Sequence, residues 1–527
     1  MKNKLLFLAL LPTFLFSLSA AQAQFPAGKD DIVILFENDV HGAVEGYPVL
    51  ADMQDLMVQQ SNYVVTISCG DFLSGTSLGS YSQGGYIVRL MNAVGYDFYT
   101  LGNHEFDYGV PMLKKRVSQL KAHPLCCNLS ENASGNMLFD SYAIRTYGCK
   151  KVAFVGITTP NVPTTSTPAF FQDSVGQWLY TFHSEHLDSL LQVCVDEVRD
   201  LGADYVVLIA HVGETDLPPL VSKTTGIDVV LDGHSHSVLP HTLLPNREGR
   251  PVLWTSTGTK FKNIGQVVIS KSGAIYSDLI QVDNVHSQKA SVSDTLEAIL
   301  RDYSAVGGRK VGCSEGELIR NSTNKELLDS PLGNLCADAY RQLSGAQIGL
   351  INRGGIRADL HQGNLTYDDL YSVLPFDNQM VLVEVSGQCL LDALEMAARH
   401  WPKLDGGFLQ VSGLTFEVDF SHPSSVVLDS NGIFLRVDGS RRVTNVNAYN
   451  PQSGRYEPLK PQHHYTVGGC EYFLLHHGDG HNFYDAKLLR SNMGIDVQVL
   501  EKFLSESLHG IIGSQYLRSQ GRIKISN

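Results

Sequence analysis

The sequence predicts an α/β protein of two domains, and three observations support that fold class. The chain has 527 residues, which is too long for one ordinary hydrophobic core. Its composition, 43% hydrophobic and 18% charged, is that of a folded soluble protein. From about residue 31 to residue 282, apolar strand-like runs alternate with amphipathic helical segments, which is typical of a layered sheet with helices on its faces.

The strands expected in the first domain are residues 32–36, 63–68, 152–157, 205–210, 252–255 and 267–270. Helices are expected at residues 49–60, 87–94, 112–121 and 186–201, where apolar positions recur at spacings of three and four. Residues 284–293 are polar and lack a core pattern, and residues 295–303 form an expected connecting helix. We therefore expect a first domain at residues 24–283, a linker at 284–303 and an α+β domain at 304–527.

The N-terminus predicts export. Lys2 and Lys4 precede an apolar run, and Ala21-Gln22-Ala23 is a small-x-small cleavage signal. The run is shorter than the roughly 20 residues of a membrane-spanning helix, and no later stretch is long and apolar enough. Residues 1–23 are therefore expected to be a signal peptide that leaves no transmembrane anchor. We expect a periplasmic, extracellular or cell-surface protein.

The charge argues against a nucleic acid polymer as partner. The formal net charge is −14, and it becomes −16 once cleavage removes Lys2 and Lys4. An acidic protein binds polyanions poorly, so a phosphorylated ligand must be attracted locally, by metal ions or arginines. The nine cysteines include no CxxC pair, which gives little support for a cysteine-based zinc site.

Five short motifs with metal-binding residue types follow expected strands of the first domain. They are Asp39-Val40-His41, Gly70-Asp71, Gly102-Asn103-His104-Glu105, His211 and Gly233-His234-Ser235-His236. Any one of them alone is ordinarily a turn, a helix cap or a surface histidine. Their joint occurrence, each after a strand, predicts one shared site.

Carboxylate, imidazole and amide groups in this number suit a pair of divalent cations. Two such ions about 3.5–4 Å apart clamp the attacking and leaving oxygens of an in-line displacement at phosphorus, and they acidify a shared water. Nitrogen and oxygen ligands without thiolate favour Zn, Mn, Co or Fe over Ca or Mg. The motifs therefore predict metal-dependent phosphoester hydrolysis.

The order DxH, GD, GNHE, H and GHxH resembles the calcineurin-like metallophosphoesterase superfamily. The strings GDFLSGT and LGNHEFDYG are similar to its secreted 5′-nucleotidase/UDP-sugar hydrolase branch. The resemblance implies an α/β/β/α metallophosphoesterase domain followed by a 5′-nucleotidase-type substrate domain.

The resemblance also implies roles for individual residues. One metal would be held by Asp39, His41 and His236, the other by Asn103, His211 and His234, with Asp71 as the bridge between them. His104 would protonate the leaving oxygen or stabilise the transition state, and Asp107 would orient its imidazole. Glu105 is not expected to be a ligand.

The second domain carries further parts of the same pattern. Asn352 and Arg357 stand in NRGGIR, similar to the family's nucleotide-contacting NGGGIR, and Phe376 ends an LPF motif whose Phe stacks on a base. Asp479 lies in a GDG segment, but His481 stands where the family has a second stacking aromatic. Either His481 itself stacks there, or Phe483 or Tyr484 takes that place. The family's arginine before the GNL segment is missing.

The expected function is release of phosphate from nucleoside 5′-monophosphates by an exported enzyme with two divalent ions and a small nucleotide as substrate. Two alternatives within the branch remain: a 2′,3′-cyclic-nucleotide phosphodiesterase/3′-nucleotidase and a UDP-sugar pyrophosphatase. The metal site cannot separate them, because each reaction attacks phosphorus in the same way. A third alternative, from another class, is a catalytically silent surface protein that only binds nucleotide.

Overall fold

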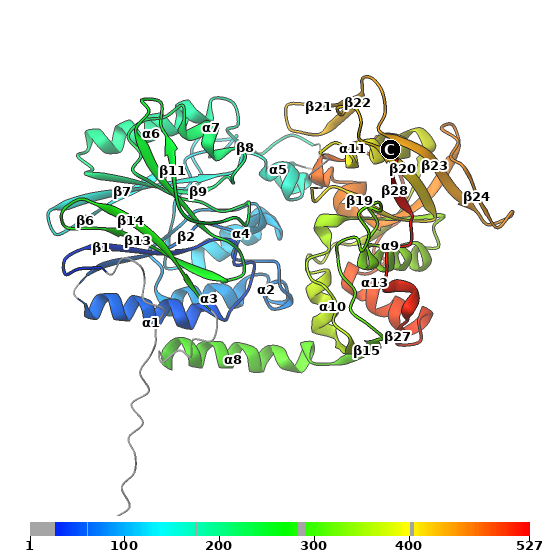
Figure 1. Cartoon of the computed structure of the whole chain (residues 1–527), viewed down its shortest axis with the longest axis horizontal. Coiled ribbons are helices and arrows are strands. Elements are labelled where there is room, and N and C mark those ends of the chain that lie inside the picture. The colour runs from blue at the N-terminus through cyan, green and yellow to red at the C-terminus, as the bar shows by residue number, and fades with distance from the viewer. Residues whose placement is uncertain (1–26, 61, 174–175, 283–289, 401–404, 527) are drawn as a thin grey trace, which may run out of the picture.

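The computed structural model describes residues 27–526 except residues 61, 174–175, 283–289 and 401–404. The expected signal peptide and most of the polar linker lie outside these described residues. The two domains lie side by side, and α8 (Ala290–Gly307) runs along their base (Figure 1). No helix among the described residues combines the length and apolar character that a membrane crossing needs. The expected two-domain α/β fold is confirmed.

Two mixed sheets form the N-terminal domain, each with six strands in the described residues. The first has the order β14-β13-β1-β2-β3-β4, built from β1 (Ile32–Glu37), β2 (Tyr63–Ser68), β3 (Phe98–Tyr99), β4 (His123–Pro124), β13 (Asn263–Ile269) and β14 (Ile275–Gln281). The second has the order β11-β12-β10-β9-β7-β6, built from β6 (Tyr142–Tyr147), β7 (Lys150–Thr158), β9 (Tyr205–His211), β10 (Val229–Leu231), β11 (Val238–Pro245) and β12 (Pro251–Thr257). Two short strands, β5 (Leu129–Glu131) and β8 (Tyr180–Phe182), pair beside them.

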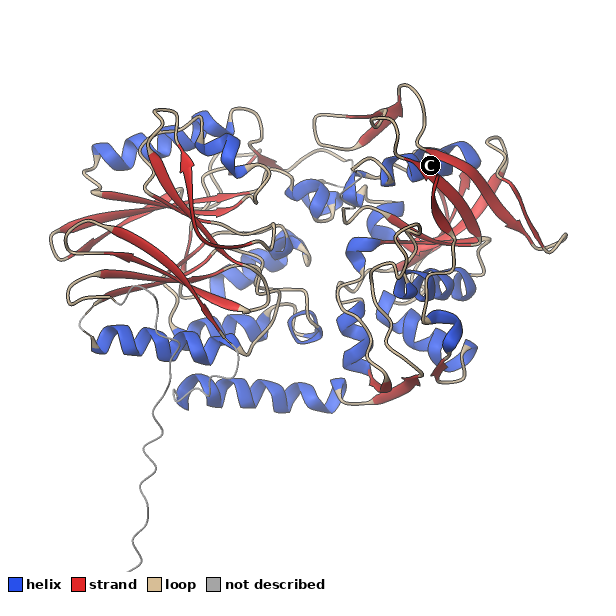
Figure 2. Ribbon diagram, viewed as in Figure 1, coloured by secondary structure: helices blue, strands red, loops and turns tan. Residues whose placement is uncertain are grey.

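Helices cover the outer face of each sheet, which gives the expected α/β/β/α layers (Figure 2). The helices of this domain are α1 (Gly46–Gln59), α2 (Ser77–Tyr81), α3 (Gly85–Val94), α4 (Gly109–Gln119), α5 (Val162–Thr165), α6 (Leu187–Asp200) and α7 (Leu217–Val221). One apolar core lies between the sheets, where Phe36 and Phe154 are buried. A second lies under α1 and α3, and a third under α6 and α7. The alternation of apolar runs and amphipathic helices follows from these three cores.

Parallel pairing brings the functional strand ends to one edge. β1 pairs parallel with β2 and β2 with β3, while β9 pairs parallel with β7 and β10. The carboxyl ends of these strands therefore face the C-terminal domain together, as expected for ligand sites in open α/β sheets. Four of the five motifs occupy turns that leave these ends, and the fifth, His211, is the last residue of β9 itself.

The C-terminal domain is built around one apolar core. Its sheets are β19-β16-β25-β18-β26, β24-β23-β20-β28, β17-β15-β27 and β21-β22, formed by β15 (Lys310–Ser314), β16 (Ile348–Asn352), β17 (Gly363–Thr366), β18 (Met380–Ser386), β19 (Leu409–Ser412), β20 (Leu414–Asp419), β21 (Val426–Leu428), β22 (Phe434–Val437), β23 (Val443–Asn450), β24 (Arg455–Pro458), β25 (His464–Cys470), β26 (Lys487–Arg490), β27 (Ile511–Ile512) and β28 (Ile523–Ser526). Its helices are α9 (Pro331–Ser344), α10 (Tyr367–Val373), α11 (Gly387–Ala397), α12 (Glu471–Leu474) and α13 (Asp496–Lys502).

The domains touch along α2, α8 and α10. Asp368 on α10 accepts hydrogen bonds from Ser77 Oγ on α2 and from Tyr303 Oη on α8, the latter at 2.8 Å. Ser80 Oγ donates to the carbonyl of Pro375, directly before Phe376. These contacts fix the loop after α10 against the N-terminal domain.

A buried ion pair fastens the last strand of the C-terminal domain. Asp338 on α9 accepts from both Nη atoms of Arg522 at 2.8 Å and from Tyr516 Oη at 2.8 Å. Burial would raise the pKa of Asp338, but Arg522, with help from Ser412 and Tyr516, outweighs it and lowers that pKa. The pair joins the helix to the C-terminal segment.

We expect Asp338→Asn to lower the free energy of unfolding by about 3 kcal/mol at neutral pH, because it leaves Arg522 partly buried without its charge partner. The folded-state pKa lies below the unfolded value of 3.8, so the carboxylate stabilises the fold above that pH. This contribution disappears as the pH falls through the folded-state pKa, and the variant and wild type should converge there. Urea unfolding at several pH values measures this.

Asp302→Asn is the matched control, since Asp302 pairs with Arg89 at 3.9 Å on the surface. It should change stability by less than about 0.5 kcal/mol. Equal effects of the two substitutions at pH 7 would contradict a structural role for the Asp338 pair.

Candidate functional site

Strained turns present the metal-type residues. Asp39, His41, Asp71, His234 and His236 all have positive φ, between 47° and 78°. Non-glycine residues seldom adopt this left-handed conformation, and it concentrates at functional sites. The turn after β1 is held by Asp39 N donating to the Gly70 carbonyl at 3.0 Å. These turns therefore bring the metal-type side chains close together, although their backbone conformation is strained.

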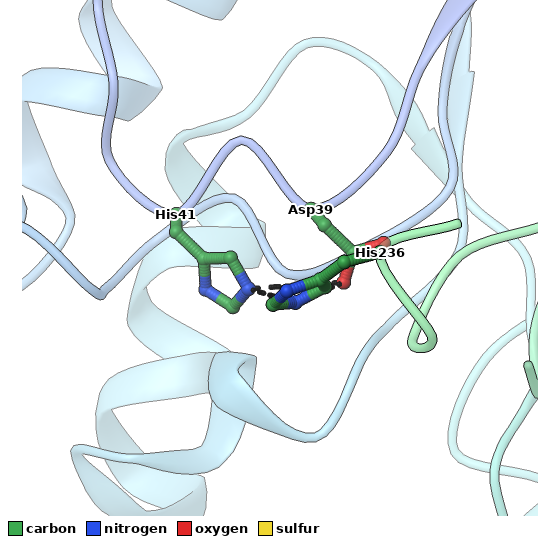
Figure 3. A group of neighbouring side chains, drawn as sticks. All are labelled: Asp39, His41 and His236. Atoms are coloured by element: carbon green, nitrogen blue, oxygen red, sulfur yellow. Dashed lines mark hydrogen bonds and ion pairs between the residues drawn. The ribbon is translucent and has the colours of Figure 1, made fainter. Parts of the chain in front are cut away.

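A first group consists of Asp39, His41 and His236 (Figure 3). The Nε2 atoms of His41 and His236 lie 2.9 Å apart, and Asp39 Oδ1 lies 3.3 Å from His236 Nε2 and 3.7 Å from His41 Nε2. Figure 3 shows both imidazoles pointing toward the carboxylate from two different turns. One cation between the three fits this arrangement of donors.

A second group consists of Asp71, His211 and His234, with Asn103 beside it. Asp71 Oδ2 lies 3.2 Å from His211 Nε2, and Asn103 Oδ1 lies 3.0 Å from His234 Nδ1. Asp71 Oδ2 is also 3.8 Å from His41 Nε2 in the first group. The Asp71 carboxylate therefore stands between the two groups. The structure brings together all seven side chains expected as ligands.

Unsatisfied buried atoms test whether metal ions fit. Asp39 Oδ1 and His211 Nε2 are buried and have no hydrogen-bond partner among the described residues. Their opposite atoms are satisfied: Asp39 Oδ2 accepts from Asn38 Nδ2 at 2.7 Å, and His211 Nδ1 lies 2.7 Å from the Cys69 carbonyl. The carbonyl contact orients the His211 ring, as is usual for a metal-ligating histidine. These residues fit a metal centre, because bound cations would give Asp39 Oδ1 and His211 Nε2 the partners that they lack.

The charges of the site are strongly coupled. Burial would raise the pKa of Asp71, but His211, His104 and His41 hold that pKa well below its usual range. Burial would lower the pKa of His211, yet the carboxylates of Asp71 and Asp39 raise it to about 10. Burial, together with the charge of His211, lowers the pKa of His234 to about 4. A cation at His211 Nε2 would therefore compete with a proton for this nitrogen.

Glu105 organises the site although the sequence did not assign it a role. Its carboxylate accepts from the backbone N–H groups of Asp71, Phe72 and Leu73 at 2.7, 2.7 and 3.2 Å, and from that of Gly102 at 2.6 Å. It thereby fastens the turn of Asp71 to the turn of Asn103. Its place in the GNHE motif, two residues after Asn103, was the available signal.

His104 faces the second domain. Its Nδ1 lies 2.9 Å from Asp107 Oδ2, and no hydrogen bond to its Nε2 is formed by the residues that the structure describes. Burial would lower the pKa of His104, but Asp107 and Asp71 raise it, so the imidazolium form is favoured. The ring stacks on Phe376, with centroids 5.5 Å apart and planes at 14°, and the Arg357 guanidinium lies 5.6 Å from the Phe376 centroid.

A cavity of about 290 Å³ opens beside this stack, between the domains. Its lining includes Asp71, Asn103, His104, Asp107, Thr165, Ser166, Thr167, His234 and His236 from the first domain, and Asn352, Arg357, Phe376, Asn378, Tyr472 and Asp479 from the second. Asn352 Nδ2 donates to Asp479 Oδ2 at 2.8 Å. Four of the six residues expected to bind substrate therefore line one cavity with the metal-type groups.

His481 and Phe483 lie elsewhere, which corrects the expectation of a stacking ring at either position. His481 is fully buried with Nε2 at 2.8 Å from the Gly407 carbonyl, and Phe483 belongs to the core of the second domain. Tyr472 supplies an aromatic wall instead, and its hydroxyl hydrogen-bonds with Asp479 and with the Thr164 carbonyl across the domain interface. Sequence reasoning missed Tyr472 because it precedes the GDG segment rather than following it.

Comparison with known proteins agrees with this geometry. Residues 32–238 match the calcineurin-like phosphoesterase family, and residues 310–486 match the 5′-nucleotidase C-terminal domain family. The chain is 25% identical to the 5′-nucleotidase of Homo sapiens and to the snake venom 5′-nucleotidase of Gloydius brevicauda; both alignments cover 95% of this chain, and 92% and 90% of the relatives. The crystal structure of a 5′-nucleotidase precursor from Thermus thermophilus shares the fold, with a TM-score of 0.80 at 23% identity over 94% of this chain and 99% of that one.

We expect Glu105→Gln to weaken divalent metal binding by about 10–100-fold, because the amide turns one acceptor into a donor facing backbone N–H groups. Metal content after equilibration in metal-buffered solution measures the effect without relying on activity. Glu315→Gln is the control, since Glu315 is exposed and directly follows β15 in the other domain. Full metal content in Glu105→Gln would show that the turns hold their positions without this carboxylate.

Proposed function

Because this chain belongs to the 5′-nucleotidase branch of the calcineurin-like metallophosphoesterases and is a metal-dependent phosphoric ester hydrolase, we propose that it releases phosphate from nucleoside 5′-monophosphates. One observation carries the proposal: a single cavity is lined by metal-type groups from the first domain and by Asn352, Arg357, Phe376 and Asp479 from the second. A phosphate end and a nucleoside end can therefore be bound at once.

The proposed metal ligands are Asp39, His41 and His236 for one ion and Asn103, His211 and His234 for the other, with Asp71 shared. The nitrogen and oxygen donors favour Zn, Mn, Co or Fe. When bound, such ions supply positive charge that polarises a phosphoryl group and acidifies water. The crowding of donors around two buried unpaired atoms supports this assignment.

His104 is the proposed proton donor to the leaving oxygen. Asp107 engages Nδ1 at 2.9 Å, so the proton available for transfer is on Nε2. Asp107 and Asp71 raise the pKa of His104, which favours the form that carries this proton. Asp107 positions the ring and stabilises its charged form, and Ser74 Oγ donates to Asp107 in turn.

The second domain is proposed to bind the rest of the nucleotide. Arg357 neutralises charge on the phosphoryl group, since it lines the cavity together with Asp71 and the histidines of the metal-type groups. Asn352 and Asp479 offer paired polar groups for sugar hydroxyls. Phe376 and Tyr472 provide apolar walls for a base. Export to the periplasm or the cell surface, indicated by residues 1–23, belongs to the same proposal.

Phosphate release from AMP, UDP-glucose and 2′,3′-cyclic AMP tests the proposed substrate class. We expect the highest kcat/KM for AMP, because one terminal phosphoryl group meets the metal-type residues while the base reaches the second domain. Chelation should abolish turnover, and adding back Mn, Co or Zn should restore it. A higher kcat/KM for either other substrate would replace the 5′-nucleotidase assignment, and absence of turnover with all three would favour a protein that only binds nucleotide.

We expect His104→Gln to lower kcat for AMP by about 10²–10⁴-fold while metal content is unchanged. The loss should be much smaller for p-nitrophenyl phosphate, because its leaving group departs without protonation. His123→Gln is the control, since His123 is an exposed histidine paired with Asp140. Equal losses on both substrates would contradict the role of His104 as an acid.

A further inference from the structure

One hydroxyl group in the wall of the interdomain cavity lacks a hydrogen-bond partner. Ser166 lines the cavity from the first domain, and only 2% of the residue is exposed to solvent. Its Oγ atom is buried and forms no hydrogen bond with the residues that the structure describes. A buried hydroxyl group without a partner destabilises a folded protein, so its presence in a ligand-sized cavity needs an explanation.

The segment that carries Ser166 has a restrained backbone. Ser166 directly follows α5, and its backbone N–H donates to the Val162 carbonyl at 2.9 Å. Pro163 lies in the first turn of α5, and Pro168 begins the short 3-10 helix that follows. Proline fixes its own φ angle, so the chain on either side of Ser166 has few alternative conformations. The position of the hydroxyl group is therefore set by the fold.

The same segment contacts both ends of the cavity. The Thr164 carbonyl accepts from Tyr472 Oη of the second domain at 3.3 Å, and the Thr165 carbonyl accepts from Asn103 Nδ2 at 3.4 Å. Helix α5 also packs against the turn Gly478–Gly480 of the second domain, and Figure 1 shows α5 on the side of the first domain that faces the second. Ser166 therefore comes directly after residues that touch the proposed base wall and a proposed metal ligand.

The neighbours of Ser166 indicate which part of a substrate it meets. The turn that packs against α5 carries Asp479, which is bonded to Asn352 and is proposed with it to bind sugar hydroxyls. The groups proposed for the phosphoryl end are Arg357 and the metal-type residues. A serine hydroxyl is neutral and can both donate and accept, so it matches the polar groups of a nucleoside.

We propose that the Ser166 hydroxyl is a further substrate contact, which hydrogen-bonds to a sugar hydroxyl or to a polar atom on the edge of the base. The inference rests on the proposed function, because the ligand of the cavity is taken to be a nucleotide. The unpaired hydroxyl destabilises the substrate-free protein, and the nucleoside supplies the missing partner when it binds. Ser166 thus favours a nucleotide over a phosphate ester that has no nucleoside.

Steady-state kinetics of metal-loaded Ser166→Ala test the contact. We expect KM for AMP to rise about three- to tenfold, the value of one hydrogen bond, with kcat little changed. The kcat/KM for p-nitrophenyl phosphate should be unaffected, because this ester has no nucleoside. Ribose 5-phosphate then locates the contact: a similar loss of kcat/KM on this substrate assigns it to the sugar, and no loss assigns it to the base.

Thermal unfolding without substrate separates this role from a structural one. Ser166→Ala should unfold at the same temperature as wild type or at a higher one, because it removes a buried hydroxyl that has no partner. Ser344→Ala is the matched control, since Ser344 is a buried serine of the second domain whose Oγ donates to the Tyr340 carbonyl at 2.6 Å. The control should unfold at a lower temperature and keep the wild-type KM for AMP.

Three results would overturn the contact and leave the proposed function standing. They are an unchanged KM for AMP in Ser166→Ala, equal losses of kcat/KM on AMP and p-nitrophenyl phosphate, and a lower unfolding temperature of this variant without substrate. Absence of phosphate release from AMP by metal-loaded wild type would overturn the proposed function and the contact together.

Discussion

The site depends on one electrostatic constraint: two buried carboxylates are surrounded by imidazoles whose nitrogens crowd toward the same oxygens. Asp39 Oδ1 lies within 4 Å of the Nε2 atoms of His41, His211 and His236. Hydrogen bonds cannot satisfy such a set, because Asp39 Oδ1 and His211 Nε2 have no partner among the described residues. Cations resolve the conflict, since each accepts several lone pairs at once. Burial lowers the pKa of His234 to about 4, with the charge of His211 adding to the shift. At His211 the carboxylates of Asp71 and Asp39 outweigh burial and raise the pKa to about 10.

Two features of the N-terminal domain hold the ligand-type side chains close together. They are the strained turns and the buried carboxylate of Glu105. Left-handed turns at Asp39, Asp71 and His234 aim their side chains inward. β1 and β10, which precede Asp39 and His234, are buried along their whole length, and β2, which precedes Asp71, is buried over its last four residues. Glu105 ties the turns of Asp71 and Asn103 through four backbone N–H groups. Burial of apolar side chains in the cores on both sides of each sheet offsets the conformational strain of these turns. Ligand geometry is therefore a property of the whole N-terminal domain.

Much of this arrangement could be predicted from local sequence. Strand-like runs followed by Asp39, Asp71 and His211 predict convergence, because parallel strands deliver their ends to one edge. Features that depend on contacts distant in sequence could not be predicted. The role of Glu105 is one of these features, because its backbone partners come together only when two turns pack against each other. His481 was expected at the substrate because of its position after Gly480, yet it is buried, and Tyr472 reaches the cavity from the preceding helix. The course of the loops in the second domain depends on tertiary packing, and a short sequence motif carries no information about that packing.

The division of labour between the domains follows from how each holds its residues. The phosphate end is fixed by strand-end turns whose positions the sheets determine, so the reaction at phosphorus tolerates little change. The proposed nucleoside end is lined by the loops after β16 and α10, by Tyr472 on the short helix α12 and by the loop after α12. Such segments tolerate change better than the sheets do. Specificity can therefore change while the chemistry is kept. Because Phe376 stacks on His104, the loop proposed to contact the base also touches the group proposed to donate the proton. Substrate binding in one domain would thereby be coupled to the chemistry of the other.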